Sequence, residues 1–180
     1  MFATLGQTIF CKVNAFAFIA FACNYFFDHA EWILLTSFDL TITECHAADI
    51  PLLLEPICYS VDPVIKKSDA KFAKEFRPSV IIESAHRLSR LGATIMKMEF
   101  PSDPNHEFDE VIMEKHCGQL TEAIDIPWVL LSAGVHFSQF VPQVKIACRA
   151  GASGFVAGRA IWKEGCTWQM RWTVKIFIGV

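Results

Sequence analysis

Residues 91–101 read LGATIMKMEFP, and this stretch decides the fold class. Gly92 ends a helical pattern, because glycine is the usual residue just after a helix. Thr94–Phe100 has the apolar composition of a short buried strand, with Lys97 at its centre and Pro101 closing it. A helix, a tight turn and a buried strand in this order are typical of a parallel sheet flanked by helices.

The same pattern recurs on both sides of this stretch. Three more apolar runs are followed by polar or small residues: IPLLL (50–54) by Glu55-Pro56, WVLL (128–131) by Ser132-Ala133-Gly134, and GFVA (154–157) by Gly158-Arg159. Helical spacing fills the intervals, after Pro78 as far as Gly92, over Phe108–Ile124 and over Phe137–Ala150. Four such units predict a parallel α/β sheet, either open and doubly wound or part of a closed barrel.

The chemically distinctive residues follow the ends of these predicted strands. They are Glu55, Lys97, Ser132, Gly134, Gly158 and Arg159. The carboxyl ends of parallel strands lie at one edge of the sheet, where the active sites of parallel α/β folds are found. The sequence therefore predicts a functional site at this edge.

Lys97 has two interpretations. A buried lysine tends to lose its proton, and its neutral amine can then attack a ketone or aldehyde to form a Schiff base, with Glu55 moving protons. In the other interpretation, Lys97 forms a structural ion pair with Glu55 or with Glu99, which would share its face of an ideal strand. The residues alone leave both open.

Two small-residue segments suit an anion. In Ser132-Ala133-Gly134 and Gly158-Arg159, small side chains let backbone N–H groups approach a ligand, and Arg159 offers a planar fork to a phosphate. In barrels, the loops after the last two strands often hold a substrate phosphate. The pattern predicts a phosphate or a similar oxyanion here.

Four segments together resemble the bacterial class I tagatose 1,6-bisphosphate aldolase family, which includes sulfofructosephosphate aldolase: LLLEP (52–56), LGATIMKMEFP (91–101), IPWVLLSAGV (126–135) and AGASGFVAGRAIW (150–162). The resemblance covers about residues 50–163. It implies the C-terminal half of a TIM (β/α)8 barrel and cleavage of a ketose phosphate through a lysine Schiff base, with no cofactor and no metal. By its motifs, Lys97 is the Schiff-base lysine and Glu55 the proton-transfer group. The resemblance also implies that the substrate phosphate is bound by Ser132, Ala133, Gly134, Gly158 and Arg159.

The chain departs from this family at both ends. Members have four more strand–helix units before the strand at Glu55, and at roughly 25 to 30 residues each these exceed what residues 1–49 can hold. We expect a Phe-rich apolar segment at 1–48, a partial aldolase barrel at 49–164 and a tail unlike the family at 165–180. Open sheet edges favour a homo-oligomer if the chain folds. A catalytically inactive, truncated aldolase fragment is the alternative function.

The composition limits the possible binding partners and the cellular compartment of the chain. The net charge is −3, so the chain lacks the surplus of basic residues that binding to nucleic-acid phosphates requires, and we expect no nucleic-acid partner. Seven scattered cysteines without a C-x-x-C pair indicate reduced thiols and a cytoplasmic chain with no metal site. The apolar run Val13–Phe27 is shorter than the roughly 18 to 20 residues of a bilayer span. We rank a non-native N-terminus first for it, a buried segment second, and a membrane or secretory signal third.

Overall fold

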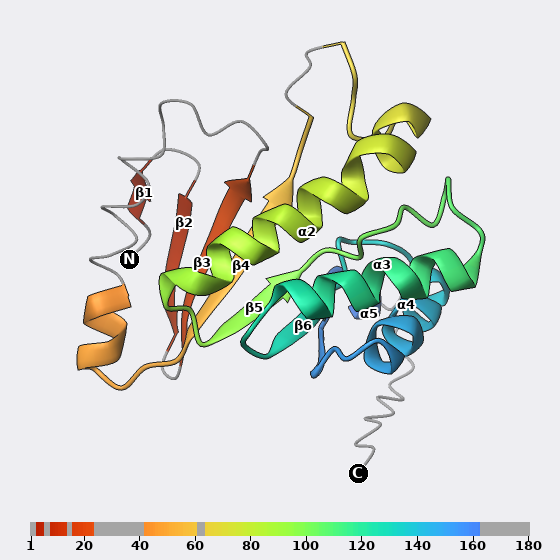
Figure 1. Ribbon diagram of the computed structural model, residues 1–180. Coiled ribbons are helices and arrows are strands. Elements are labelled where there is room, and N and C mark those ends of the chain that lie inside the picture. The colour runs from red at the N-terminus through yellow and green to blue at the C-terminus, as the bar shows by residue number, and fades with distance from the viewer. Residues whose placement is uncertain (1–2, 6–7, 14–15, 24–41, 61–63, 163–180) are drawn as a thin grey trace.

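A single mixed sheet organises the chain in the computed structural model, which describes residues 3–5, 8–13, 16–23, 42–60 and 64–162 (Figure 1). Its strands, in both chain and spatial order, are β1 (Ala3–Leu5), β2 (Thr8–Val13), β3 (Phe16–Cys23), β4 (Leu52–Cys58), β5 (Ile95–Met98), β6 (Trp128–Leu131) and β7 (Gly154–Val156). The helical elements are η1 (Phe72–Phe76), α2 (Arg77–Leu88), η2 (Ser89–Leu91), α3 (Glu110–Ala123), α4 (Phe137–Arg149) and α5 (Arg159–Trp162), and residues 42–47 are also helical.

The four predicted strands are confirmed as β4, β5, β6 and β7, which pair in parallel with α2, α3 and α4 between them. The sheet also continues towards the N-terminus, because β3 pairs in parallel with the whole of β4, and β1, β2 and β3 pair antiparallel. Much of the apolar run at 13–27 is thus strand, while residues 14–15 and 24–27 lie outside the described residues. No helix in the described ranges is long and apolar enough to cross a membrane.

Pro56 lies within β4, although a proline after a short apolar run usually marks the end of a strand. Leu52 donates its N–H to Thr94 Oγ1 and accepts from Thr94 N–H, so even-numbered positions of β4 direct their backbone groups towards β5. The pairing of β4 with β5 ends at Leu54, two residues before Pro56. The missing N–H of Pro56 therefore costs no hydrogen bond between these two strands. The other side of β4 stays paired with β3 through Cys58.

Helix boundaries follow local capping chemistry. Pro78 lies in the first turn of α2, and Gly92 follows η2 in a left-handed conformation with φ +98°. Asp109 caps α3 by accepting the N–H of Val111 at 2.9 Å, so this helix starts two residues after the predicted Phe108. Val111 and Ile112 have the helical spacing of apolar residues but are exposed, and the buried residues of this helix are Cys117 and Leu120.

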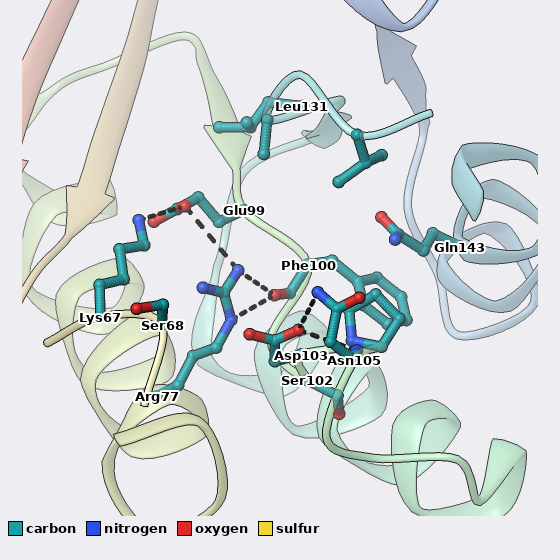
Figure 2. A pocket seen from close by; sticks show the side chains of 13 residues that line it. Lys67, Ser68, Arg77, Glu99, Phe100, Ser102, Asp103, Asn105, Leu131 and Gln143 are labelled. Carbon is teal, nitrogen blue, oxygen red and sulfur yellow. Dashed lines mark hydrogen bonds and ion pairs between the residues drawn. The ribbon is translucent and has the colours of Figure 1, made fainter. Parts of the chain in front are cut away.

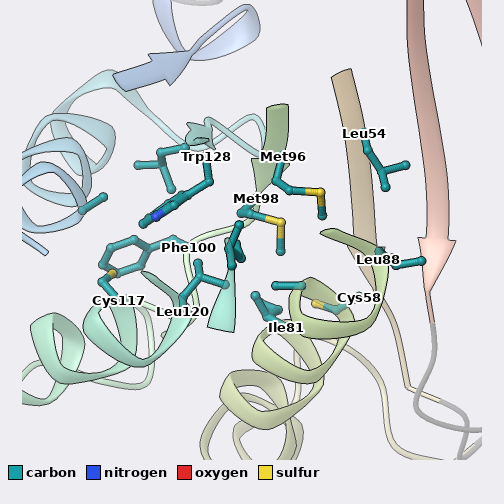
Figure 3. Packing of buried hydrophobic residues seen from close by; sticks show 14 of the residues in the cluster. Leu54, Cys58, Ile81, Leu88, Met96, Met98, Phe100, Cys117, Leu120 and Trp128 are labelled. Atoms are coloured by element: carbon teal, nitrogen blue, oxygen red, sulfur yellow. The ribbon is translucent and has the colours of Figure 1, made fainter. Parts of the chain in front are cut away.

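The core lies between the sheet and its helices (Figure 3). Burial alternates along β4 and β5, so that one face of each strand is fully covered and the other is half-buried. The covered face contributes Leu54, Met96 and Met98, which pack with Ile81 and Leu88 of α2. The half-buried face carries the polar residues of the strands, which makes it the face available for chemistry.

Candidate functional site

Glu55 and Lys97 meet on the half-buried face of the sheet. The register pairs Leu54 with Met96, so the next residue on each strand stands beside the other. Lys97 Nζ donates to Glu55 Oε2 at 3.0 Å, and their side chains are 15% and 12% exposed. The structure thus brings together the two residues that sequence reasoning assigned to catalysis. Their catalytic roles remain predictions.

This arrangement is suited to proton transfer. The carboxylate lies within hydrogen-bond reach of the amine, which is the first geometric requirement for a general acid or base. Partial burial strengthens the interaction between the two groups by reducing screening by water. Lys97 also lies opposite Val129 of β6, so an apolar side chain borders the amine on the next strand. A carbonyl carbon brought to the nitrogen would therefore meet a nucleophile and a proton carrier together.

Glu99 does not pair with Lys97, although the two residues are two positions apart. β5 ends at Met98, and the Glu99 carboxylate lies against the end of β4, where Cys58 N–H donates to Oε2 at 2.7 Å. Its Oε1 accepts from Lys67 Nζ at 2.7 Å and lies 3.8 Å from Arg77 Nη2 (Figure 2). Glu99 therefore ties the ends of the two strands that carry Glu55 and Lys97.

Arg77 completes this cluster. Its guanidinium donates through Nε and Nη2 to the carbonyl oxygen of Phe100, at 3.3 and 3.0 Å. Burial alone would raise the pKa of Glu99, but the charges of Arg77 and Lys67 and the hydrogen bonds to its oxygens hold that pKa below the ordinary value. Burial and the neighbouring Glu99 raise the pKa of Cys58 to about 12. The cluster is thus a stable, ionised anchor.

Sequence reasoning missed Lys67 and Arg77. Both precede or begin α2, where a basic residue is ordinarily solvent-exposed, and no local pattern marks either one as a partner of Glu99. Their contacts join residues 22 to 32 positions apart in the sequence. The single available signal was Glu99 itself, because an acidic residue next to a buried strand requires partners.

The predicted anion-binding segments also come together. Ser132 is buried, its carbonyl oxygen accepts the N–H of Val135 at 3.1 Å, and the turn between them places Ala133 at φ +49° and Gly134 at φ +75°. A Cβ added to Gly134 would lie 3.2 Å from Arg159 Cζ, so the guanidinium packs against this glycine. Arg159 follows Gly158 at the start of α5.

The Glu55–Lys97 pair and the Gly134–Arg159 pair lie at the ends of neighbouring strands. Lys97 is in β5, and the turn at Gly134 follows β6, which is the next strand of the sheet. Arg159 follows β7, which pairs with β6 in turn. Parallel pairing brings these ends to one edge of the sheet. In the part of the chain that the structure describes, no three His, Cys, Asp or Glu side chains gather as a metal site.

Comparisons with known proteins identify a family. The family model described as DeoC/LacD family aldolase matches residues 26–164. Tagatose 1,6-diphosphate aldolase 1 of Enterococcus faecalis is 30% identical over an alignment of 137 residues, which covers 68% of this chain and 41% of that protein. Tagatose 1,6-diphosphate aldolase of Listeria monocytogenes is 29% identical, over 68% of this chain and 39% of that protein. The chain therefore spans about two fifths of the length of these curated relatives.

Solved structures give the same fold. A Schiff-base-forming fructose-1,6-bisphosphate aldolase superposes with a TM-score of 0.57 at 19% identity, covering 75% of this chain and 48% of that one. An archaeal fructose-1,6-bisphosphate aldolase with its lysine bound to a carbinolamine intermediate gives 0.56 at 18% identity, covering 75% and 47%. These likenesses confirm the predicted fold class, an α/β chain with the architecture of part of a TIM-barrel aldolase.

Proposed function

Because the chain belongs to the DeoC/LacD aldolase family, we propose that it is a class I aldolase in which Lys97 forms a Schiff base with a phosphorylated ketose such as tagatose 1,6-bisphosphate. The observation that carries the proposal is the half-buried contact of 3.0 Å between Lys97 Nζ and Glu55 Oε2. A second supporting observation is the packing of Arg159 against Gly134 beside the next strand.

The chemistry begins when Lys97 passes a proton to Glu55 and its neutral amine attacks the ketone carbon of the substrate. Glu55 returns the proton to the oxygen, water leaves and a protonated imine forms. The bond that then breaks joins the carbon next to the imine carbon to the following, hydroxyl-bearing carbon. The Glu55 carboxylate takes the proton of that hydroxyl, whose oxygen becomes the aldehyde oxygen, and the electrons of the broken bond move towards the positive nitrogen, giving an enamine and an aldehyde. Protonation of the enamine and hydrolysis release the ketone product and restore Lys97.

The anionic end of the substrate is assigned to the turn after β6 and to Arg159. Ser132, Ala133, Gly134 and Gly158 offer small side chains and backbone N–H groups, while Arg159 supplies charge. An arginine paired with a phosphate gives short, charge-assisted hydrogen bonds. This assignment predicts that a phosphorylated ketone reacts with Lys97 far better than the same ketone without its phosphate.

The test is trapping of the imine with borohydride. Full-length protein is incubated with dihydroxyacetone phosphate, reduced and mapped by peptide mass spectrometry, and an adduct is expected on Lys97. Lys97→Met should remove it, whereas Lys145→Met, which alters an exposed lysine of α4, should not. An adduct spread over several lysines, or its persistence in Lys97→Met, contradicts the proposal. Circular dichroism spectra of both variants establish that they are folded.

The phosphate assignment has a separate readout. Dihydroxyacetone phosphate should be trapped faster than dihydroxyacetone, and Arg159→Gln should lower this preference by about tenfold or more, the usual effect of losing a charged hydrogen bond. Arg90→Gln is the matched control, because Arg90 is exposed and pairs with Asp125 at 3.8 Å. An unchanged preference in Arg159→Gln would rule out this phosphate site.

The alternative function is that of a catalytically inactive member of the family, which binds the ketone without cleaving a sugar. Trapping on Lys97 together with no aldol cleavage of tagatose 1,6-bisphosphate would favour it. Trapping together with cleavage would favour the aldolase.

A further inference from the structure

The Glu55–Lys97 pair lies beside a gap in the pairing of β4 with β5. The backbone groups at even-numbered positions of β4 point towards β5, and the two strands are in register only as far as Leu54. Pro56, the next even-numbered residue, has no N–H to donate. Glu55 and Lys97 therefore meet just beyond the last backbone pairing of their strands, where nothing in that pairing keeps the strands together.

A side chain closes this gap. Cys58 is the even-numbered residue of β4 that follows the proline, and its N–H donates to Glu99 Oε2 at 2.7 Å, beyond the end of β5 at Met98. The Glu99 carboxylate thus accepts the hydrogen bond that a backbone carbonyl accepts in a regular sheet. Glu99 follows Lys97 in sequence, and Cys58 follows Glu55. The contact therefore joins the two strands on the far side of the Glu55–Lys97 pair.

Two cations fix the Glu99 carboxylate in this position. Its Oε1 accepts from Lys67 Nζ at 2.7 Å and lies 3.8 Å from Arg77 Nη2. Arg77 also donates to the carbonyl oxygen of Phe100, which holds the backbone directly after Glu99. A cavity of about 450 Å³, which Gln143 lines at its other end, borders this cluster (Figure 2). On that side, polar contacts rather than close packing hold the carboxylate.

We propose that Glu99 is a positioning residue, which holds the Lys97 amine beside the Glu55 carboxylate by supporting the end of β4. This inference rests on the proposed aldolase function, and it adds that imine formation needs the contact between Glu99 and Cys58. Proton transfer requires heavy atoms about 2.6–3.2 Å apart. A displacement of about 1 Å at the end of β4 would take the two groups out of reach and can slow a reaction by about a hundredfold.

Two substitutions separate the reach of the side chain from its charge. Glu99→Gln keeps an oxygen for Cys58 N–H but loses the charge, whereas Glu99→Asp keeps the charge and is one methylene shorter. At saturating dihydroxyacetone phosphate, Glu99→Asp should lower the rate constant for borohydride trapping on Lys97 by about tenfold or more, and Glu99→Gln by less than about threefold. The half-saturating concentration should stay within about twofold of the wild type, because Arg159 keeps its place after β7.

A stability-matched control separates positioning from folding. Leu120 of α3 is fully buried, so Leu120→Ala destabilises the chain through a cavity in the core. A role of Glu99 in stability alone would lower the fraction of chains that react and leave the rate constant of the folded fraction unchanged. Both quantities are measured for every variant, at a temperature where circular dichroism shows that it is folded. Leu120→Ala should keep the wild-type rate constant.

A second readout needs no imine. Lys97 is acetylated with acetic anhydride and mapped by mass spectrometry, with the exposed Lys145 as the internal reference. In Glu99→Asp the ratio of Lys97 to Lys145 acetylation should rise by about threefold or more, because the amine loses the carboxylate that favours its charged, unreactive form. Glu99→Gln and Leu120→Ala should keep the wild-type ratio.

The two readouts distinguish this inference from the proposed function. If the wild type gives no adduct on Lys97, the proposed function fails, and the acetylation ratio alone decides the positioning role. A slower rate constant and a higher acetylation ratio in Glu99→Asp support it. Wild-type values of both in Glu99→Asp, or a larger change in Glu99→Gln than in Glu99→Asp, overturn it.

Discussion

Replacing Glu99 with glutamine should lower the free energy of unfolding by about 3 kcal/mol at neutral pH. The residue is 3% exposed, and its carboxylate contacts Cys58 N–H and Lys67 Nζ, each at 2.7 Å, and Arg77 at 3.8 Å. Removing one member of a buried ion pair costs about 3–5 kcal/mol. The lower end applies here because glutamine keeps an oxygen for Cys58 N–H and because the Lys67 side chain is 36% exposed. For a chain of this size, the melting temperature should fall by about 6 to 12 °C.

The effect should depend on pH in a defined direction. The pKa of Glu99 is held below its ordinary value of 4.5 in the folded chain, against the opposing effect of burial, by Arg77 and Lys67. A carboxyl whose pKa is lower in the folded state stabilises fully above its unfolded pKa, and this stabilisation is lost as the pH falls through the folded pKa. Acidification should therefore destabilise the wild type more than Glu99→Gln, and their difference should narrow below about pH 4.

Urea unfolding followed by circular dichroism, at neutral pH and at about pH 3.5, measures both effects. Glu83→Gln is the matched control, because Glu83 contacts Arg87 at 2.5 Å with side chains 40% and 50% exposed. An exposed pair of this kind contributes at most about 1 kcal/mol. Equal losses in the two variants, or a loss in Glu99→Gln that stays the same at both pH values, would refute the reasoning.

Three further changes test packing and thiol chemistry. Gly118→Ala should stabilise the chain by about 0.5–1 kcal/mol, because no atom lies within 4 Å of the added Cβ in α3. Gly151→Ala should destabilise it by at least about 1 kcal/mol, because φ is +106° and the added Cβ would lie 2.7 Å from Thr121 Cγ2. Urea unfolding measures both, and a loss in the first or a gain in the second contradicts the geometry. Iodoacetamide near pH 8 should label exposed Cys148 quickly and Cys58, whose pKa is raised to about 12, only after unfolding. Equal labelling rates in the folded chain would contradict this.

The sequence predicted features that depend on local periodicity. Buried strands at 128–131 and around Lys97 follow from short apolar runs between glycine and proline, and their parallel order follows from the helices between them. The sequence also predicts that Glu55 and Lys97 lie close together, because neighbouring parallel strands have their carboxyl ends at the same edge of the sheet. The catalytic use of this pair remains a prediction.

Features set by long-range contacts were missed. Pro56 looks like a strand terminator unless it is known that the ladder to β5 has already ended. Val111 has the spacing of a buried residue but lies near the start of α3, where it is 77% exposed. The partners of Glu99 and the cavity beside Gln143 depend on side chains from several elements. No periodicity within one segment contains that information.

The alternation along β4 and β5 also constrains which misfolded pairings the chain can tolerate. Leu54 and Met96 face the helices, and their neighbours Glu55 and Lys97 face the other way. A one-residue slip in either strand would exchange the faces and put a charged group among the side chains of α2. In that position an ammonium or carboxylate would lose most of its hydration and its partner together. The ion pair thus disfavours off-register intermediates during folding, independently of any reaction at Lys97.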